Sequence, residues 1–251
     1  MTTTDQPAPE ARKGELSSPG KATVRCITRL QHRYRNDNPA AVAVLARLRR
    51  EAGRAVHDSP DSWGIDGLED LVTVRAEESG RGRDEDRDLR EEEAVHLAVT
   101  LWALHQQSVY DDNMHRPGWG LGRAVRHLAV TKANPNGAGD DEKPARQGRA
   151  NDELNESLRK RFVRIGTSTS YDVLAVRLRE MVLLLRGARV SLDYGLLADQ
   201  LFRWQDEEER SEVRRSWGRD FHVVPARRDG DTGTSGEKEG DLPGDDHDSG
   251  E

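Results

Sequence analysis

The sequence has very little cysteine and no long apolar run. Cys26 is the single cysteine among 251 residues, so an internal disulfide and a thiolate metal site are both excluded. The longest run of large apolar side chains is residues 181–185, whereas a membrane-spanning helix needs about 20 apolar residues. Residues 1–20 also lack the apolar segment of a secretory signal. We therefore expect a soluble, cytoplasmic protein without redox chemistry and without a membrane partner.

Recognisable catalytic motifs are also missing. The eight histidines are scattered, and neither a His-Glu-x-x-His metal motif nor a Gly-x-Ser-x-Gly nucleophile motif occurs. Asp111, Asp112 and His115 are metal-ligand types, but no second ligand cluster accompanies them, which favours a polar loop before Pro117. His105 lies on an apolar helix stripe, which favours a hydrogen-bonded core histidine over a catalytic base. The sequence thus predicts no metal, no cofactor and no catalytic residue.

Glycine and tryptophan mark one unusual segment, residues 118–122, with the sequence GWGLG. It resembles a phosphate-binding loop, but a dinucleotide fingerprint needs a preceding strand, and here a helical pattern precedes it. We interpret it as a turn leading into a helix. Trp102, Trp204 and Trp217 lie on or beside apolar helix stripes and are predicted to be core residues. Trp119, in the glycine-rich turn, is the tryptophan best placed to stack on a nucleic-acid base.

The net charge of -7 hides a strong segregation of charge along the chain. Residues 21–57 hold nine basic and two acidic side chains, and residues 123–190 hold fourteen and eight. Residues 58–93 are acidic, with five basic and fourteen acidic side chains, and residues 225–251 hold three basic and nine acidic side chains. Arginine makes up most of the basic residues, and its planar guanidinium pairs well with phosphate. Basic blocks in an acidic protein are typical of a phosphate-binding surface, although solvated helix faces are the alternative.

Composition also divides the chain into folded and unfolded parts. Residues 1–20 and 225–251 hold almost no large apolar side chains, which predicts disordered polar tails. Residues 76–92 and 132–150 are predicted to be long internal loops for the same reason. The folded body is then residues 21–224, either as one helical domain or as two subdomains, about 21–131 and 151–224.

Apolar residues in that body recur with the period of a helix, so the predicted fold class is an all-α helical bundle. Asn38 and Pro39 form a helix start, and Gly53 follows the end of that helix. Glu91, Glu92 and Glu93 are predicted to lie at the start of the next one. The helical stripes cover residues 38–52, 94–105, 121–128, 154–162, 174–185, 197–204 and 213–221. Residues 71–74 are the one candidate for a short extended segment.

Arginine clusters on these helices are the predicted binding residues. A protein that holds nucleic acid by its backbone needs cations on rigid helices and no particular base-reading geometry. The candidate nucleic-acid-binding residues are Arg47, Arg49, Arg50, Arg123, Arg126, Arg159, Arg161, Arg177 and Arg179.

The C-terminal third resembles the CasB family, the small subunit of the type I-E CRISPR surveillance complex Cascade. The resemblance rests on residues 178–185 (LREMVLLL), 190–201 (VSLDYGLLADQL) and 213–221 (VRRSWGRDF). Upstream, four further blocks follow the family's order and extend the resemblance over residues 21–224: 46–50 (ARLRR), 101–105 (LWALH), 120–128 (GLGRAVRHL) and 159–162 (RKRF). The acidic C-terminal tail and the insert at 76–92 depart from the family pattern.

The resemblance implies a non-catalytic, all-helical subunit present in two copies along the guide RNA. Its implied partners are the other Cascade subunits, a second copy of itself, the guide RNA, and the target DNA with its displaced strand. Carried over by position, the arginines named above become the candidate residues for nucleic-acid contact and R-loop stabilisation.

Two other functions remain open at this stage. A basic, all-helical protein could be a helix-turn-helix regulator that reads a specific DNA sequence. A hydrolase built on Asp111, Asp112 and His115 is the second alternative.

Overall fold

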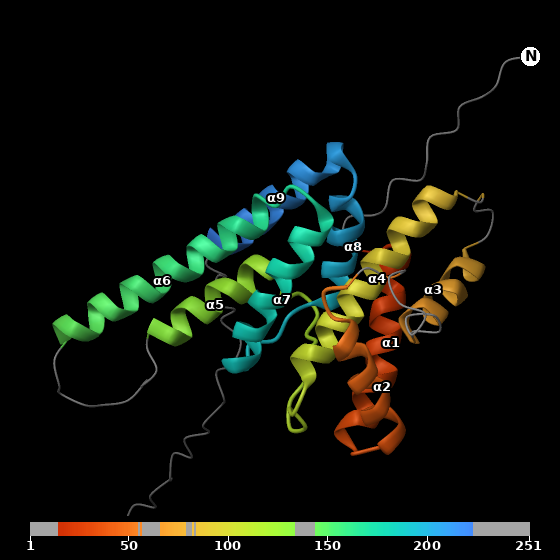
Figure 1. The fold of residues 1–251 in the computed structure, drawn as a ribbon, viewed down its shortest axis with the longest axis horizontal. Coiled ribbons are helices and arrows are strands. Elements are labelled where there is room, and N and C mark those ends of the chain that lie inside the picture. The colour runs from red at the N-terminus through yellow and green to blue at the C-terminus, as the bar shows by residue number, and fades with distance from the viewer. Residues whose placement is uncertain are drawn as a thin grey trace, which may run out of the picture.

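The computed structural model describes residues 15–54, 56, 66–78, 82, 84–133 and 144–222, and these residues form a helical structure (Figure 1). The helices are α1 (Ser18–Arg35), α2 (Pro39–Glu51), α3 (Asp66–Glu77), α4 (Glu85–Gln106), α5 (Leu121–Ala133), α6 (Pro144–Gly166), α7 (Tyr171–Gly187), α8 (Tyr194–Trp204) and α9 (Glu207–His222). No strand occurs within the described ranges, which confirms the all-α fold class. The predicted tail at 225–251 and most of that at 1–20 lie outside the described residues.

Helix α4 is the centre of the molecule. Every residue from Ala94 to Gln106 is buried, because α1, α2, α3, α7 and α8 all pack around this half of the helix. Figure 1 shows α1, α2 and α3 on one side of α4, and α5, α6 and α9 beyond α7 on the other. Trp102, Trp204 and Trp217 are each at most 1% exposed, as predicted for core residues. Buried residues from α1 to α9 form one hydrophobic cluster.

Two helix ends agree closely with the sequence prediction. The Asn38 side chain accepts hydrogen bonds from the backbone amides of Ala40 and Ala41 and so caps α2. Helix α7 ends at Gly187, as predicted.

The extended segment predicted at 71–74 is wrong, because these residues lie within α3. Leu71 and Val74 are buried, whereas Val72 is 63% exposed. A spacing of three between the buried side chains fits one face of a helix. Packing of α3 against α1 and α4 therefore overrides the β-branched residues' preference for a strand.

The loop predicted at 76–92 is also partly wrong, since α4 begins at Glu85. The side chain of Asp84 accepts a hydrogen bond from the Arg87 amide and caps this earlier start. Glu91 is consequently not at a helix start but within the helix, fully buried. It pairs there with Arg75 at 2.9 Å and Arg87 at 3.1 Å.

Two other helices begin inside segments predicted to lack structure: α1 at Ser18 and α6 at Pro144. The start of α1 is held by Asp199 of α8, whose carboxylate accepts hydrogen bonds from the Ser17 amide and hydroxyl and from the Gly20 amide. The free backbone amides at the start of α1 thus bond to a carboxylate from a distant helix, and not to a capping side chain nearby in the sequence. None of the described helices is long and apolar enough to cross a membrane.

Candidate nucleic-acid interface

The glycine-rich segment 118–122 is a turn that leads into α5, as predicted, and the structure explains two of its glycines. Gly118 has a φ of +75°, which side-chain-bearing residues rarely adopt. A β-carbon on Gly122 would lie 2.1 Å from the carbonyl oxygen of Trp217, so this glycine allows α5 to approach α9. The segment is therefore built for a turn and for helix packing.

Trp119 projects from this turn and is surrounded by cations. The guanidinium carbons of Arg116 and Arg123 lie 4.7 Å and 4.6 Å from the centre of its ring. The His127 ring meets the indole edge-on, with the ring centres 5.2 Å apart. These cation–π and edge contacts hold the half-buried indole in one position.

The two predicted arginines of α5 lie beside this tryptophan. Arg126 donates a hydrogen bond to the carbonyl oxygen of His222 at 3.1 Å, which uses one of its five N–H donors. Burial raises the pKa of Asp220, and the charges of Arg219 and Arg123 oppose this in part, so Arg123 acts on this carboxyl. The α5 arginines are thus anchored at one edge and half-buried rather than freely extended into solvent.

Arginines of α2 and α7 lie on either side of Gly53, just beyond the end of α2. Arg47 and Arg50 are exposed on α2. The stem of Arg179, on α7, lies against Gly53, just beyond the end of α2, at 3.2 Å from the place a β-carbon would take. The structure therefore places Arg179 near the C-terminal end of α2. Arg49 is half-buried, and its charge acts on the hydroxyl group of Tyr110, a residue of the loop between α4 and α5.

The remaining three predicted arginines have different surroundings. Arg159 is exposed on α6, and Arg161 is exposed with Glu180 at 3.7 Å. Arg177 instead donates to the Ser168 hydroxyl at 3.1 Å and to the carbonyl oxygen of Arg164, so it closes the C-terminal end of α6. Arg177 is thereby engaged in holding α6 against α7.

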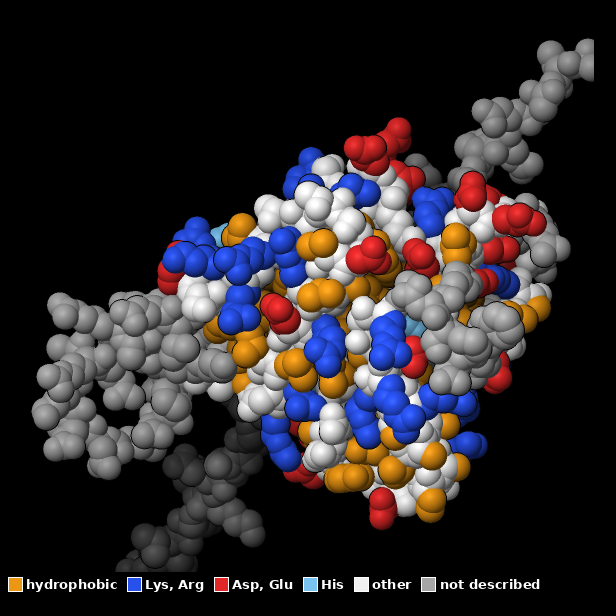
Figure 2. Space-filling view, in the orientation of Figure 1, with side chains coloured by type: hydrophobic (Ala, Val, Ile, Leu, Met, Phe, Trp, Pro, Cys, Tyr) orange, Lys and Arg blue, Asp and Glu red, His pale blue; other side chains and the backbone are white. Residues whose placement is uncertain are grey.

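Most ion pairs of the described residues involve other arginines. Arg75 contacts three carboxylates, and Arg29 and Arg203 hold Asp70 and Glu209. Figure 2 shows the same division on one face: Lys and Arg side chains spread from α6 across α7 to α2, whereas Asp and Glu gather toward α3, α4 and the start of α9. Within the described part of the chain, Arg50, Arg159 and Arg179 form no ion pair. Their charge is available to an external anion.

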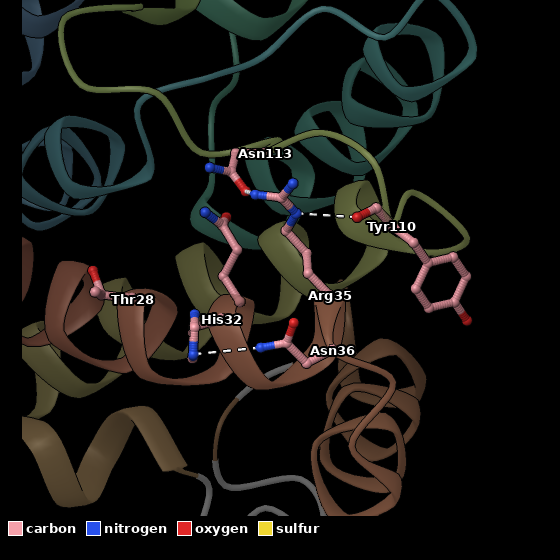
Figure 3. Close-up of a pocket in the computed structure, with 7 residues that line it drawn as sticks. Thr28, His32, Arg35, Asn36, Tyr110 and Asn113 are labelled. Atoms are coloured by element: carbon pink, nitrogen blue, oxygen red, sulfur yellow. Dashed lines mark hydrogen bonds between the residues drawn. The ribbon is translucent and has the colours of Figure 1, made fainter.

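A hollow of about 390 Å³ lies between α1 and the loop after α4 (Figure 3). Figure 3 shows Arg35 reaching from α1 to that loop, where its Nε donates to the Tyr110 carbonyl at 3.0 Å. Its Nη1 donates to the Asn113 side chain at 3.2 Å. His32 of α1 and Asn36, just beyond the end of α1, are joined by a hydrogen bond of 3.4 Å. Arg35 is thus occupied in tying the loop to α1.

The proposed hydrolytic trio is not assembled. Asp111 pairs with Arg189 at 2.7 Å, and this hydrogen bond lowers the pKa of the Asp111 carboxyl. Asp112 accepts from the Asn113 amide. His115 is buried and accepts a hydrogen bond from the Tyr194 amide at 3.2 Å. Across the described ranges, no three His, Cys, Asp or Glu side chains are grouped to hold a metal ion.

His105 is the hydrogen-bonded core histidine that the sequence predicted. Its Nδ1 lies 2.8 Å from the Tyr194 hydroxyl, and the side chain is fully buried. Burial, with the nearby Arg186 charge, lowers the pKa of His105 to about 3. It is therefore neutral over the physiological range and serves packing between α4 and α8.

Sequence reasoning missed Arg116, whose guanidinium carbon lies 4.7 Å from the centre of the Trp119 ring. It lies in an irregular loop, where no helical stripe marks an outward-facing side chain. The available signal was its position three residues before Trp119, within reach of the aromatic ring.

Comparison with known proteins agrees with this structure. Residues 44–222 match the family model of CRISPR-associated protein Cse2. The crystal structure of CasB from Thermobifida fusca is 39% identical and superposes with a TM-score of 0.64, covering 83% of this chain and all of that one. A chain of a CRISPR RNA-guided surveillance complex shares the fold at 22% identity and a TM-score of 0.50, covering 81% and 93% of the two chains. Comparison with curated protein sequences finds no match. The chain therefore belongs to the CRISPR-associated Cse2 family, the CasB family whose sequence blocks it carries.

Proposed function

We propose that this protein is the non-catalytic small subunit of a type I-E Cascade complex. In that role it binds the nucleic-acid backbone without sequence preference and stabilises the R-loop formed by guide RNA and target DNA, including the displaced strand. Its partners are the other Cascade subunits, a second copy of itself, the guide RNA and the target DNA. The family match and the likeness to a chain of a surveillance complex support this assignment.

The observation that carries the proposal is the division of charge between two sets of arginines. Carboxylates of α3, α4 and α9 are paired with arginines outside the predicted set. Arg50, Arg159 and Arg179 are exposed on rigid helices, outside the ion pairs of the described residues. A cation without an internal partner loses less on binding phosphate than one that must first leave a carboxylate.

This arrangement suits a subunit that does not read sequence. In guide-directed recognition, base pairing selects the target, and the exchange of one duplex for another is nearly balanced in free energy. Backbone contacts from several arginines then shift the balance toward the open state. Each contact also releases counterions, which makes binding strongly dependent on salt.

The test compares two arginine variants of the assembled complex. The double variant Arg50→Ala with Arg179→Ala removes two cations that form no ion pair with the described residues. The control, Arg189→Ala, removes a cation that Asp111 already neutralises. We expect the double variant to lower the slope of log affinity against log salt by up to about two, for every target sequence alike. The Arg189→Ala control should leave the slope nearly unchanged.

Two results contradict the proposal. Equal slopes for the wild-type complex and the double variant would show that these side chains do not touch phosphate. A preference of the purified chain for one DNA sequence by roughly 4–10 kcal/mol would instead favour a sequence-reading regulator.

A further inference from the structure

We propose that the hollow beside Trp119 is a binding site for one unpaired nucleobase of a single strand. This inference rests on the proposed function, since it names what the α5 arginines hold. The hollow measures about 150 Å³ and is lined by Trp119, Arg123, Arg126, His127 and Val130.

The walls of the hollow combine cations with apolar and aromatic surface. Arg123 lies over the indole of Trp119 at 4.6 Å, and His127 meets the same indole edge-on. Val130, one turn further along α5, is 58% exposed. A ligand in this hollow therefore meets flat, π-rich groups on one side and an aliphatic side chain on another.

This composition favours a base over a bare phosphate. Phosphate gains from guanidinium groups and from an imidazole N–H, but nothing from the Val130 methyls or the face of the Trp119 indole. Nucleobases have a polarisable face that stacks on aromatic rings and on arginine guanidinium planes. An exposed valine amid cations is explained if a base covers it when the strand is bound.

The cations place the strand that carries the base. Arg126 is fixed by its bond to the His222 carbonyl and retains four other N–H donors. A phosphate on Arg126 would lie at the rim of the hollow, with the attached base able to turn inward. Bases within a duplex are stacked on both faces, so an unpaired strand is the ligand class that can present one.

The tryptophan is held in advance of binding. Arg116 and Arg123 both contact its ring, and the Trp119 backbone is joined to Arg116 and to Asp193 by hydrogen bonds of 3.2 Å and 2.8 Å. A side chain fixed in this way loses little conformational freedom when a ligand arrives. The site is thus preorganised.

The experiment measures binding of the full-length protein to two short strands of equal length and charge. One is an oligothymidylate, and the other is its abasic counterpart, which keeps the sugar and phosphate but lacks the bases. We expect the wild-type protein to bind the abasic strand at least about fivefold more weakly. Trp119→Ala should weaken oligothymidylate binding by a similar factor and leave abasic binding unchanged.

A second variant guards against loss of folding, because Trp119 packs partly against the core. His127→Ala removes one exposed wall of the hollow, and we expect it to reduce the difference between the two strands. Arg189→Ala, which lies outside the hollow, is the control and should keep that difference intact.

The outcomes separate this inference from the proposed function. Salt-dependent binding that is equal for both strands, and equally affected in each by Trp119→Ala, overturns the base site while leaving backbone binding in place. Absence of binding to either strand at low salt overturns both. A larger loss for the abasic strand than for oligothymidylate in Trp119→Ala also contradicts the site.

Discussion

Gly122 and the carbonyl oxygen of Trp217 are so close that no side chain fits between them. A β-carbon on Gly122 would lie 2.1 Å from that oxygen and 2.7 Å from the Phe221 amide nitrogen, both of them backbone atoms of α9. Backbone atoms cannot rotate out of the way as a side chain can. The spacing of α5 and α9, and with it the position of Trp119 and Arg126, depends on this glycine.

Gly122→Ala should therefore lower the free energy of unfolding by about 3 kcal/mol, because α5 must move away from α9. Urea unfolding checks this. Gly218→Ala, within α9, is the matched control: among the described residues, no atom from outside its own stretch of helix lies within 4 Å of its β-carbon position, so alanine should stabilise the helix by about 0.5–1 kcal/mol. Equal effects of the two substitutions would contradict the close approach.

The α5 arginines yield a prediction on salt dependence. Arg123→Ala with Arg126→Ala should weaken DNA binding by the assembled complex uniformly across sequences and lower the salt slope by up to about two. Gel-shift titrations at two salt concentrations measure the slope. An unchanged slope would mean that neither side chain touches phosphate.

Arg177 and Arg159 should differ in what they affect. Arg177→Ala leaves the Ser168 hydroxyl and the Arg164 carbonyl without this donor, so we expect it to reduce stability by about 1–2 kcal/mol. Arg159→Ala, on an exposed side chain, should leave stability within about 0.5 kcal/mol and lower the salt slope instead. Thermal unfolding and salt titration of both variants test the contrast, and a reversed pattern would refute it.

His105 predicts how stability responds to acid. Burial lowers the pKa of His105 from an ordinary 6.5 to about 3 in the folded protein. Below pH 6.5 the unfolded chain therefore binds a proton on this ring that the folded chain does not bind. This contribution to stability is complete above pH 6.5 and is lost as the pH falls toward 3, at up to about 1.4 kcal/mol per pH unit. Denaturant unfolding at pH 7 and pH 5 measures the change.

His105→Gln is the control for that measurement. It removes the titrating ring, so its stability should fall less than that of the wild type between the same two pH values, whatever its starting stability. A wild type and variant with parallel pH dependence would show that His105 does not titrate as its burial requires.

The sequence predicted the elements whose signals are local. Asn38 before Pro39 marks a capped helix start in any context, and the apolar stripe of α7 with Gly187 after it needs no tertiary information. The family resemblance, which combined several such helices in order, is confirmed by the comparisons.

The errors arose where distant residues decide the structure. The start of α1 depends on Asp199, which lies far along the chain, and the early start of α4 exposes its first turns while burying Glu91 against Arg75. Residues 71–74 were assigned by β-branched composition, whereas their helical packing is imposed by neighbouring helices.

The candidate site was predictable in composition but not in geometry. Arginine counts identify basic helices, yet a sequence does not reveal that Arg177 closes α6 or that Arg179 reaches Gly53. Trp119 was predicted to lie in the glycine-rich turn, but its burial and its contact with Arg116 depend on the path of an irregular loop.

The encirclement of α4 has a consequence for how this chain folds as it is synthesised. The ribosome releases α4, which ends at Gln106, well before α8, which begins at Tyr194. Until α7 and α8 emerge, one flank of the half of α4 that is buried in the folded protein faces water, and a nascent chain in that state is prone to associate with others. Truncation products that stop before Tyr194 should consequently be recovered in aggregates or bound to chaperones rather than as native-like fragments.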